Sequence, residues 1–282
     1  MANFATEQTE QTELIKSLRE PAIYPHPVTA VEVLETHISY VLLAGDFAYK
    51  FKKPLDLGFL DYSTLAARKF FCEEELRLNR RLAPHLYLDV VSIYGSSTAP
   101  RFVAVDGEVP IEHAVRMRRF RQEMLFDRLA QSGGLHDEHI DSLAEVIAAF
   151  HRDIPPAGVG TPYGTAAAIE APLRQNFAQL RPLLDTPVEH AELDSIEQWS
   201  LREYTRCVEV GIFAARRATG CVRECHGDLH LGNVAWLADT PDTAPRAIPF
   251  DGIEFAANLR WIDVISAVAF IVMDLHARGF AN

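Results

Sequence analysis

The sequence predicts an α+β fold with a β-rich N-terminal lobe and a mainly helical C-terminal lobe. Before residue 120, most apolar segments are short, β-branched or alternating, and bounded by turn residues, which is typical of strands. After residue 120, apolar residues recur mainly at helical spacing. Strands and helices that are segregated along a chain indicate an α+β arrangement, and 282 residues suffice for two lobes.

The first strands are predicted between residues 29 and 51. The segment Thr36 to Gly45 is β-branched and aliphatic, and Gly45-Asp46 is a turn signal before the next strand. In the segment FAYKF, side chains alternate, so that Lys50 lies on the face opposite the aromatic residues. One helix, residues 63–82 with Ser63 as its cap, follows in this lobe. Further strands are predicted over residues 86–96, 101–107 and 113–120.

The C-terminal lobe is predicted to contain a series of helices and one short β-rich section. The helices are expected over residues 124–131, 139–154, 171–180, 189–219 and from 261 onward, with strands within 221–255. Residues 1–12 are polar and are expected to be disordered. The predicted organisation is therefore a disordered segment 1–12, an N-lobe 13–117 and a C-lobe 118–282.

Composition restricts the classes of partner. The formal net charge of -12 argues against a nucleic acid or an anionic membrane as the main partner. The most apolar segment, Val264 to Leu275, is too short to span a bilayer and indicates a buried helix. The N-terminus lacks the apolar core of a signal peptide, and no cysteine spacing indicates secretion. A cytoplasmic protein is expected.

The segment HGDLHLGN, residues 226–233, is the main candidate for chemistry. It places an asparagine five positions after an aspartate, the spacing of the catalytic loop of kinases. Phosphoryl transfer needs a carboxylate that orients the acceptor hydroxyl and takes its proton, and oxygen ligands that hold magnesium on the nucleotide. We therefore predict Asp228 as the catalytic base, Asn233 as a metal ligand, and His226 as a structural residue that holds the loop by hydrogen bonds.

A second metal ligand should follow after a short hairpin. Asp251 comes directly after the apolar segment AIPF and before Gly252, which is the position of the metal-binding acid in kinases. The prediction thus requires that two loops, 226–233 and 250–252, converge in one site.

Three other interpretations are open at this stage. A Gly-Asp-x-His motif also occurs in metallophosphoesterases, with Asp137-Glu138-His139 as an upstream partner, but Val234 stands where a downstream motif needs histidine. A non-catalytic, pseudokinase-like ATP-binding regulatory module would carry the same loop. A zinc site could be built from four residues, although they do not form a C-x-x-C pair: Cys221, Cys225, His226 and His230.

HGDLHLGN followed by PFDG resembles the aminoglycoside phosphotransferase-like kinase family, also called the choline and aminoglycoside kinase-like group. Residues 36–88 resemble a bacterial subgroup in which a P-loop ATPase domain often follows the kinase-like domain, and the resemblance covers about residues 20–275. No G-x-x-x-x-G-K-[ST] motif occurs in this sequence, so the resemblance leaves room for a separate P-loop ATPase partner. Relatives continue with further helices, so the C-lobe is expected to be shortened.

The resemblance implies a two-lobed protein-kinase-like fold that binds ATP and Mg²⁺ in the cleft and phosphorylates a small-molecule acceptor. It implies a lysine on an N-lobe strand, Lys50 with Lys52 as the alternative. Its partner would be Glu75 on the following helix, with Glu73 and Glu74 as alternatives. It also implies a hinge that meets adenine at Arg116, Met117 and Arg118, and a turn over the phosphates at Gly45-Asp46.

Overall fold

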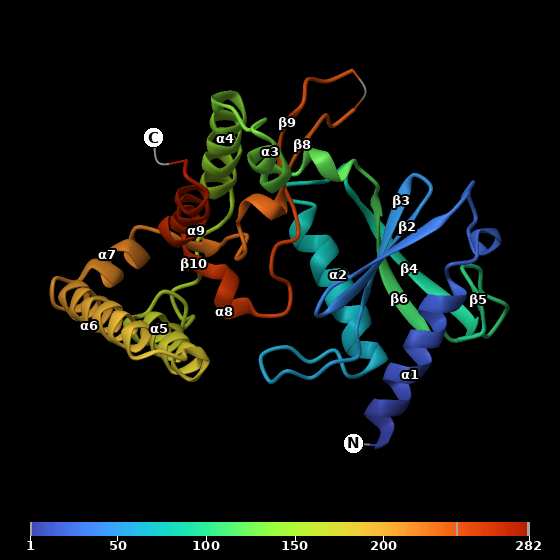
Figure 1. The fold of residues 1–282 in the computed structure, drawn as a ribbon, viewed down its shortest axis with the longest axis horizontal. Coiled ribbons are helices and arrows are strands. Elements are labelled where there is room, and N and C mark those ends of the chain that lie inside the picture. Colours follow the sequence, from blue (N-terminus) through green and yellow to red (C-terminus); the bar gives the residue numbers. More distant parts are fainter. Residues whose placement is uncertain (1, 241, 281–282) are drawn as a thin grey trace.

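The computed structural model describes residues 2–240 and 242–280, and it has the predicted two-lobed α+β architecture (Figure 1). The N-terminal lobe is built on an antiparallel sheet of order β1-β2-β3-β6-β4-β5. Its strands are β1 (Val31–Glu35), β2 (Ser39–Ala44), β3 (Phe47–Lys52), β4 (Tyr87–Ser96), β5 (Ala99–Arg101) and β6 (Glu112–Arg118). The fold class predicted from the sequence is confirmed.

Helix α2 (Leu65–Asn79) packs on one face of this sheet. Its N-cap is Thr64, whose hydroxyl accepts a hydrogen bond from the Ala67 amide at 3.1 Å, rather than the predicted Ser63. The alternation of β3 turns Ala48 and both lysines toward α2, and it turns Tyr49 and the neighbouring aromatic residues to the other face. Two charged side chains from β3 therefore enter the layer between the sheet and the helix.

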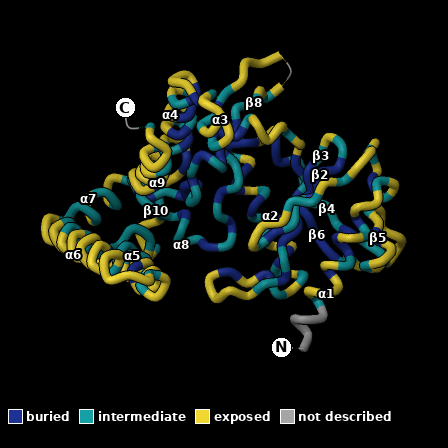
Figure 2. Tube along the Cα trace, viewed as in Figure 1, coloured by how far each residue is buried: buried dark blue, intermediate teal, exposed yellow. Residues whose placement is uncertain are grey.

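The C-terminal lobe is mainly helical, and Figure 2 shows that its outermost helices, α5 and α6, are largely exposed. Its small sheets pair β7 with β10 and β8 with β9.

The predicted helix 189–219 is divided where Gly211 adopts a φ of 72°. The last helix begins at Val264 rather than Trp261, because residues 261–263 pair with β7. The elements are η2 (Gln122–Met124), α3 (Phe126–Ser132), α4 (Asp137–Asp153), α5 (Ala166–Leu180), η3 (Arg181–Leu183), α6 (Pro187–Glu209), α7 (Ile212–Ala218), β7 (Val222–Glu224), η4 (Leu231–Asn233), β8 (Val234–Leu237), β9 (Arg246–Pro249), α8 (Ala257–Arg260), β10 (Trp261–Asp263) and α9 (Val264–Ala277).

A charged cluster ties α2 to the C-terminal lobe. The Glu224 carboxylate of β7 accepts from Arg77 at 2.9 Å and from Arg260 at 3.0 Å, and it pairs with Arg81 at 3.2 Å. Because Arg77 and Arg81 lie at and just after the end of α2, this cluster anchors the helix that carries Glu75 to the lobe that carries the loop 226–233.

Among the described helices, none is both long and apolar enough to cross a bilayer.

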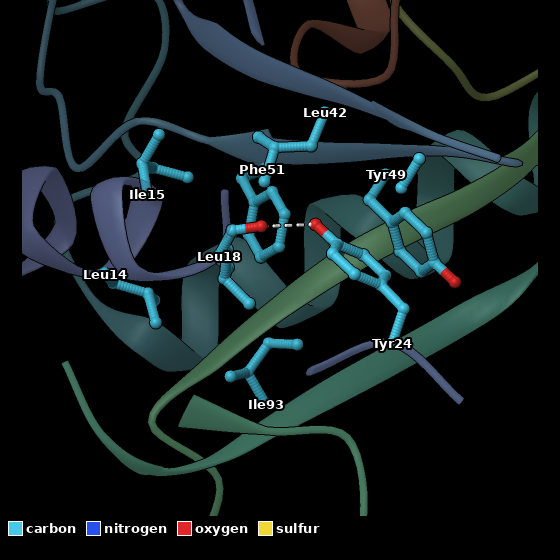
Figure 3. Close-up of a cluster of buried hydrophobic side chains, with 10 residues drawn as sticks. Leu14, Ile15, Leu18, Tyr24, Leu42, Tyr49, Phe51 and Ile93 are labelled. Carbon is cyan, nitrogen blue, oxygen red and sulfur yellow. Dashed lines mark hydrogen bonds between the residues drawn. The ribbon is translucent and has the colours of Figure 1, made fainter. Parts of the chain in front are cut away.

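The expectation of disorder is wrong for residues 2–12, which belong to helix α1 (Ala2–Ser17); residue 1 lies outside the described part. The end of α1 and the short helix η1 (Pro21–Ile23) lie against the sheet face opposite α2. Leu14, Ile15 and Leu18 are buried there, and the Tyr24 hydroxyl donates to the Leu18 carbonyl at 2.7 Å (Figure 3). Gln11, in the polar part of the helix, is also buried and donates to the Lys52 carbonyl and to the Glu112 carboxylate, both at 2.8 Å, which the polarity of the sequence does not reveal.

Candidate active site

A cavity of about 800 Å³ lies between the two lobes. The N-terminal lobe contributes the β1–β2 turn, the face of β3 that carries Lys50, and Tyr87. The C-terminal lobe contributes residues from both loops that were predicted to converge: Asp228, His230, Gly232, Asn233 and Asp251. The candidate groups for base, metal and phosphate therefore line one cavity.

The loop 226–233 is held in place by His226. This side chain is buried; its Nε2 donates to the carbonyl of Phe250 at 2.8 Å, and its Nδ1 accepts from the Asp228 amide at 3.3 Å. Burial lowers the pKa of His226 to about 4. The ring is consequently neutral at pH 7 and can hold both bonds at once. The structural role predicted for His226 is confirmed.

Asp228 is half-exposed in the cavity and is fixed by its neighbours. The side-chain Nδ2 of Asn233 donates to the Asp228 carbonyl at 2.9 Å and to its carboxylate at 3.0 Å, and His230 Nε2 lies 3.6 Å from the same carboxylate oxygen. Burial alone would raise the pKa of Asp228, but attraction to His230 and His226 and the bond from Asn233 hold it below its usual range. The carboxylate is thus ionised and oriented at neutral pH.

Lys50 connects the N-terminal lobe with the loop that carries Asp251. Its Nζ donates to Glu75 Oε1 at 2.9 Å and also pairs with the Asp251 carboxylate. Burial would lower the pKa of Lys50, but the carboxylates of Asp251 and Glu75 raise it well above its usual value. The ammonium group therefore remains charged despite its burial.

The structure distinguishes among the three candidate glutamates of α2. Glu75 is fully buried, and its two oxygens accept from Lys50 and from Lys52. Glu74 instead binds Arg77, and Glu73 lies on the surface beside Lys69. Burial would raise the pKa of Glu75, but the ammonium groups of Lys50 and Lys52 hold it below its usual range. Lys50 and Glu75 form the predicted pair, whereas their contact with nucleotide stays a prediction.

Asp251 lies in a constrained turn. Its φ is 61°, the only positive value for a non-glycine residue in the described ranges. Its amide donates to the Tyr87 hydroxyl at 3.1 Å, and the Gly252 amide donates to Asn79 Oδ1 at 2.8 Å. Neither Asn79 nor Tyr87 was predicted from the sequence as part of the site. Asn79 was detectable, because a polar residue four positions after Glu75 lies on the same buried face of the helix.

Arg116 does not line the cavity, so the hinge prediction is wrong for this residue. Opposite Tyr49 in the sheet, it lies on the face away from Lys50 and makes a bidentate ion pair with Asp89 at 2.9 and 2.6 Å. The other two predicted hinge residues do line the cavity. Arg119 and Phe120, which were not predicted from the sequence, continue this stretch, so the cavity is lined by Met117, Arg118, Arg119 and Phe120.

The prediction for Gly45-Asp46 is also wrong. This turn joins β2 to β3 at the hinge, where the Asp46 carbonyl accepts from the Arg119 amide at 2.8 Å. The other end of β2 covers the cavity through Thr36, His37 and Ile38. The Gly-Asp pair correctly indicated a hairpin turn, but the local signal does not say which end of the sheet faces the other lobe.

The two metal-centred alternatives lack geometric support. His226 is engaged with Phe250, and the Cys225 thiol donates to the Ile262 carbonyl at 3.6 Å. His139 packs against Trp236, with ring centroids 4.4 Å apart. Across residues 2–240 and 242–280, no group of three or more His, Cys, Asp or Glu side chains is arranged to hold a metal ion. The geometry favours neither a zinc site nor the several ligands of a metallophosphoesterase.

No family model matches the sequence. An uncharacterized protein of Mycobacterium bovis and two from strains of Mycobacterium tuberculosis are each 32% identical over 257 residues. These matches cover 90% of this chain and 48% of each relative, so the chain spans about half the length of the curated relatives it matches. A choline/ethanolamine kinase family protein from Mesorhizobium loti aligns with a TM-score of 0.45 and 15% identity, over 97% of this chain and 71% of that chain.

Proposed function

We propose that this protein is a magnesium-dependent phosphotransferase that moves the γ-phosphate of ATP to a hydroxyl group of a small molecule. The observation that carries the proposal is the convergence of Lys50, Asp228, Asn233 and Asp251 on one interlobe cavity. An oriented carboxylate, a buried ammonium group and oxygen donors are the groups that phosphoryl transfer requires. The proposal specifies the acceptor as a hydroxyl compound and no further.

The donor set fits magnesium. Asn233 and Asp251 offer amide and carboxylate oxygens, and magnesium in nucleotide sites usually takes one or two carboxylates together with phosphates and water. When bound, this ion would neutralise charge on the transferring phosphoryl group. Asn233 and Asp251 are the residues that would hold it. The half-exposed Asp251 carboxylate and the Asn233 side chain both face the cavity, which supports this assignment.

Lys50 and Asp228 would have separate tasks. The Lys50 ammonium, oriented by Glu75, would meet the phosphates of the nucleotide. Asp228 would accept the proton of the acceptor hydroxyl, since its carboxylate is ionised, accessible and held in one orientation by Asn233. This intact base favours an enzyme over a non-catalytic ATP-binding module.

Thermal unfolding with and without ATP and magnesium tests the first step, because a ligand that binds the native state raises the unfolding temperature. An unchanged unfolding temperature at millimolar ATP-Mg contradicts the proposal. Turnover is then measured against a panel of hydroxylated metabolites and aminoglycosides.

Asp228→Asn tests the mechanism. It should reduce turnover by about 10²- to 10⁴-fold and leave ATP-Mg affinity nearly unchanged. Asp153→Asn is the matched control, since Asp153 pairs with Arg152 on the surface of α4. Undiminished turnover by Asp228→Asn would show that this carboxylate is not the base. ATP-Mg binding without turnover on any acceptor would favour the non-catalytic module.

A further inference from the structure

A second lysine lies behind Lys50 in the same buried cluster. Lys52 is fully buried, and its Nζ donates to Glu75 Oε2 at 2.6 Å and to the carboxylate of Glu254. Glu254, also buried, accepts a further hydrogen bond from the Tyr62 hydroxyl. The Lys52 ammonium also lies 5.0 Å from the centroid of the Tyr62 ring. The described cluster thus extends from β3 and α2 through Lys52 to the segment that follows Asp251.

This arrangement joins the two lobes at one point. Lys52 and Tyr62 belong to the N-terminal lobe, whereas Glu254 lies three residues after Asp251. The Glu254 carbonyl accepts from Arg260 at 3.0 Å, so its backbone is fixed to the C-terminal lobe as well. Each residue from 251 to 254 thus has a hydrogen-bond partner. Asp251 bonds to Tyr87, Gly252 to Asn79 and Ile253 to His226. Glu254 bonds to Lys52 and to Tyr62.

The balance of charge in the cluster points toward Asp251. Two ammonium groups, Lys50 and Lys52, face three carboxylates, Glu75, Glu254 and Asp251, which leaves one negative charge in excess. Asp251 is the member with a substantially exposed side chain, at 38%, whereas the other four lie at 11% or less. The excess charge is therefore accessible where a metal-bound nucleotide would arrive.

A strained backbone needs surroundings that over-determine it. The φ of 61° at Asp251 brings its carboxylate to Lys50, and this conformation must be maintained by the anchors on either side. His226 and Asn79 anchor the turn through the backbone, and the bond to Lys52 anchors it through a buried charge. Loss of that charge would leave Glu254 without a cation in a low-dielectric interior and would release the segment.

We propose that Lys52, Tyr62 and Glu254 form a positioning clamp that sets the place of the Asp251 carboxylate for the metal-bound nucleotide. The clamp acts through Asp251: Lys52 and Tyr62 lie outside the cavity lining, and Glu254, which lies at the cavity wall, has its carboxylate bound by both of them. The inference rests on the proposed function, because it assigns the clamp to the same magnesium site.

The test measures the affinity for ADP by calorimetry, with and without magnesium. In Lys52→Met and Glu254→Gln, the magnesium-dependent gain in ADP affinity should fall by about tenfold, as is usual when groups that orient a metal ligand are removed. Lys52 does not line the cavity, so Lys52→Met should keep its ADP affinity without magnesium within about twofold, whereas Glu254→Gln alters one lining residue and is judged by the magnesium-dependent gain alone. Lys69→Met and Glu73→Gln, which alter a surface Lys–Glu pair on α2, are matched controls and should keep the full gain.

Tyr62→Phe is the mild variant, because it removes one hydroxyl donor and keeps the ion pair. It should reduce the magnesium-dependent gain by about threefold, as expected for one lost hydrogen bond, and its thermal unfolding verifies that it is folded. If Lys52→Met does not fold, Tyr62→Phe decides the question. An unchanged gain in the folded Tyr62→Phe protein overturns the clamp.

The Asp251→Asn background separates positioning from a general structural effect. If the clamp acts through Asp251, Glu254→Gln should cause no further loss of the magnesium-dependent gain in that background. Fully additive losses would overturn the inference. A wild-type protein that binds neither ADP nor ADP-Mg would contradict the proposed function instead, so the two failures are distinguishable.

Discussion

The imidazole of His226 joins the two loops of the site, because its Nε2 donates to the Phe250 carbonyl at 2.8 Å while its Nδ1 accepts from the Asp228 amide at 3.3 Å. A neutral ring has one donor and one acceptor, which matches these two partners. An imidazolium has two donors, so protonation would set an N–H against the Asp228 N–H. The protonation state of this buried side chain therefore controls how the loop 226–233 is held against Phe250, the residue before Asp251.

This arrangement predicts a specific loss of stability in acid. The pKa of His226 is lowered to about 4 in the folded protein, against about 6.5 in the unfolded chain. The neutral form is thus favoured by folding, and its contribution is complete above pH 6.5 and lost as the pH falls toward 4. The difference amounts to about 3 kcal/mol. Urea unfolding of the wild type and of His226→Asn across this range measures it, and parallel curves for the two proteins would contradict it.

Glu75 and Glu73 offer a matched pair on one helix. Glu75→Gln would leave the ammonium groups of Lys50 and Lys52 buried with one carboxylate fewer, at a cost of about 3 kcal/mol or more in unfolding free energy. We also expect ATP-Mg affinity to fall, because Lys50 loses its support. Glu73→Gln affects a surface pair and should change stability by less than about 0.5 kcal/mol. Denaturant titration and calorimetry measure both, and equal effects would refute the assignment of Glu75.

Gly252 is expected to tolerate no side chain. A Cβ at this position would lie 2.9 Å from the His226 carbonyl, which itself accepts from the Ile253 amide at 3.0 Å. Gly252→Ala should therefore destabilise the protein by about 1–3 kcal/mol through overpacking and displace the Asp251 turn. Gly160→Ala is the control, since nothing lies within 4 Å of its added Cβ. Thermal unfolding distinguishes the two, and a Gly252→Ala protein as stable as Gly160→Ala would show that the loops are less tightly packed.

His230 is expected to determine the pH at which kcat/KM falls on the acid side of its pH profile. Attraction to His230 helps to keep the pKa of Asp228 below its usual range, and the pKa of His230 is raised in return by Asp228. His230→Asn removes that attraction, so the pKa of Asp228 should rise and the acid limb of the kcat/KM profile should move to higher pH. ATP turnover measured from pH 4 to 8 records the limb. The exposed His85→Asn serves as control, and a coincident acid limb in all three proteins would rule out the coupling.

Strand alternation and loop spacing were readable from the sequence because both depend on neighbours in the chain. Alternation in FAYKF placed Lys50 opposite the aromatic face, and the spacing of HGDLHLGN brought Asp228 within reach of Asn233. The same local character explains the errors. Gly45-Asp46 signals a turn wherever a hairpin reverses, and a polar N-terminus gives no sign of the buried residues that anchor α1.

Contacts between segments that lie far apart in the sequence decided which of the other candidate residues face the site. Three consecutive glutamates on α2 are equivalent in sequence, and only the rotation of the helix against β3 turns Glu75 inward. The register of β6 against β3 likewise places Arg116 opposite Tyr49, on the face away from the cavity. Neither rotation nor register follows from local propensity, because both result from the packing of whole surfaces.

The sequence by itself determined the two-lobed α+β fold, the loop 226–233 and the aspartate at 251, since each follows from apolar periodicity or from spacing within a few residues. Only the tertiary structure decided that Glu75 serves two lysines and that Glu254, 202 positions after Lys52, completes the cluster behind Asp251. The physical reason is that a buried charge requires partners of opposite sign, and in this fold they come from strands, helices and loops that meet only after both lobes have packed.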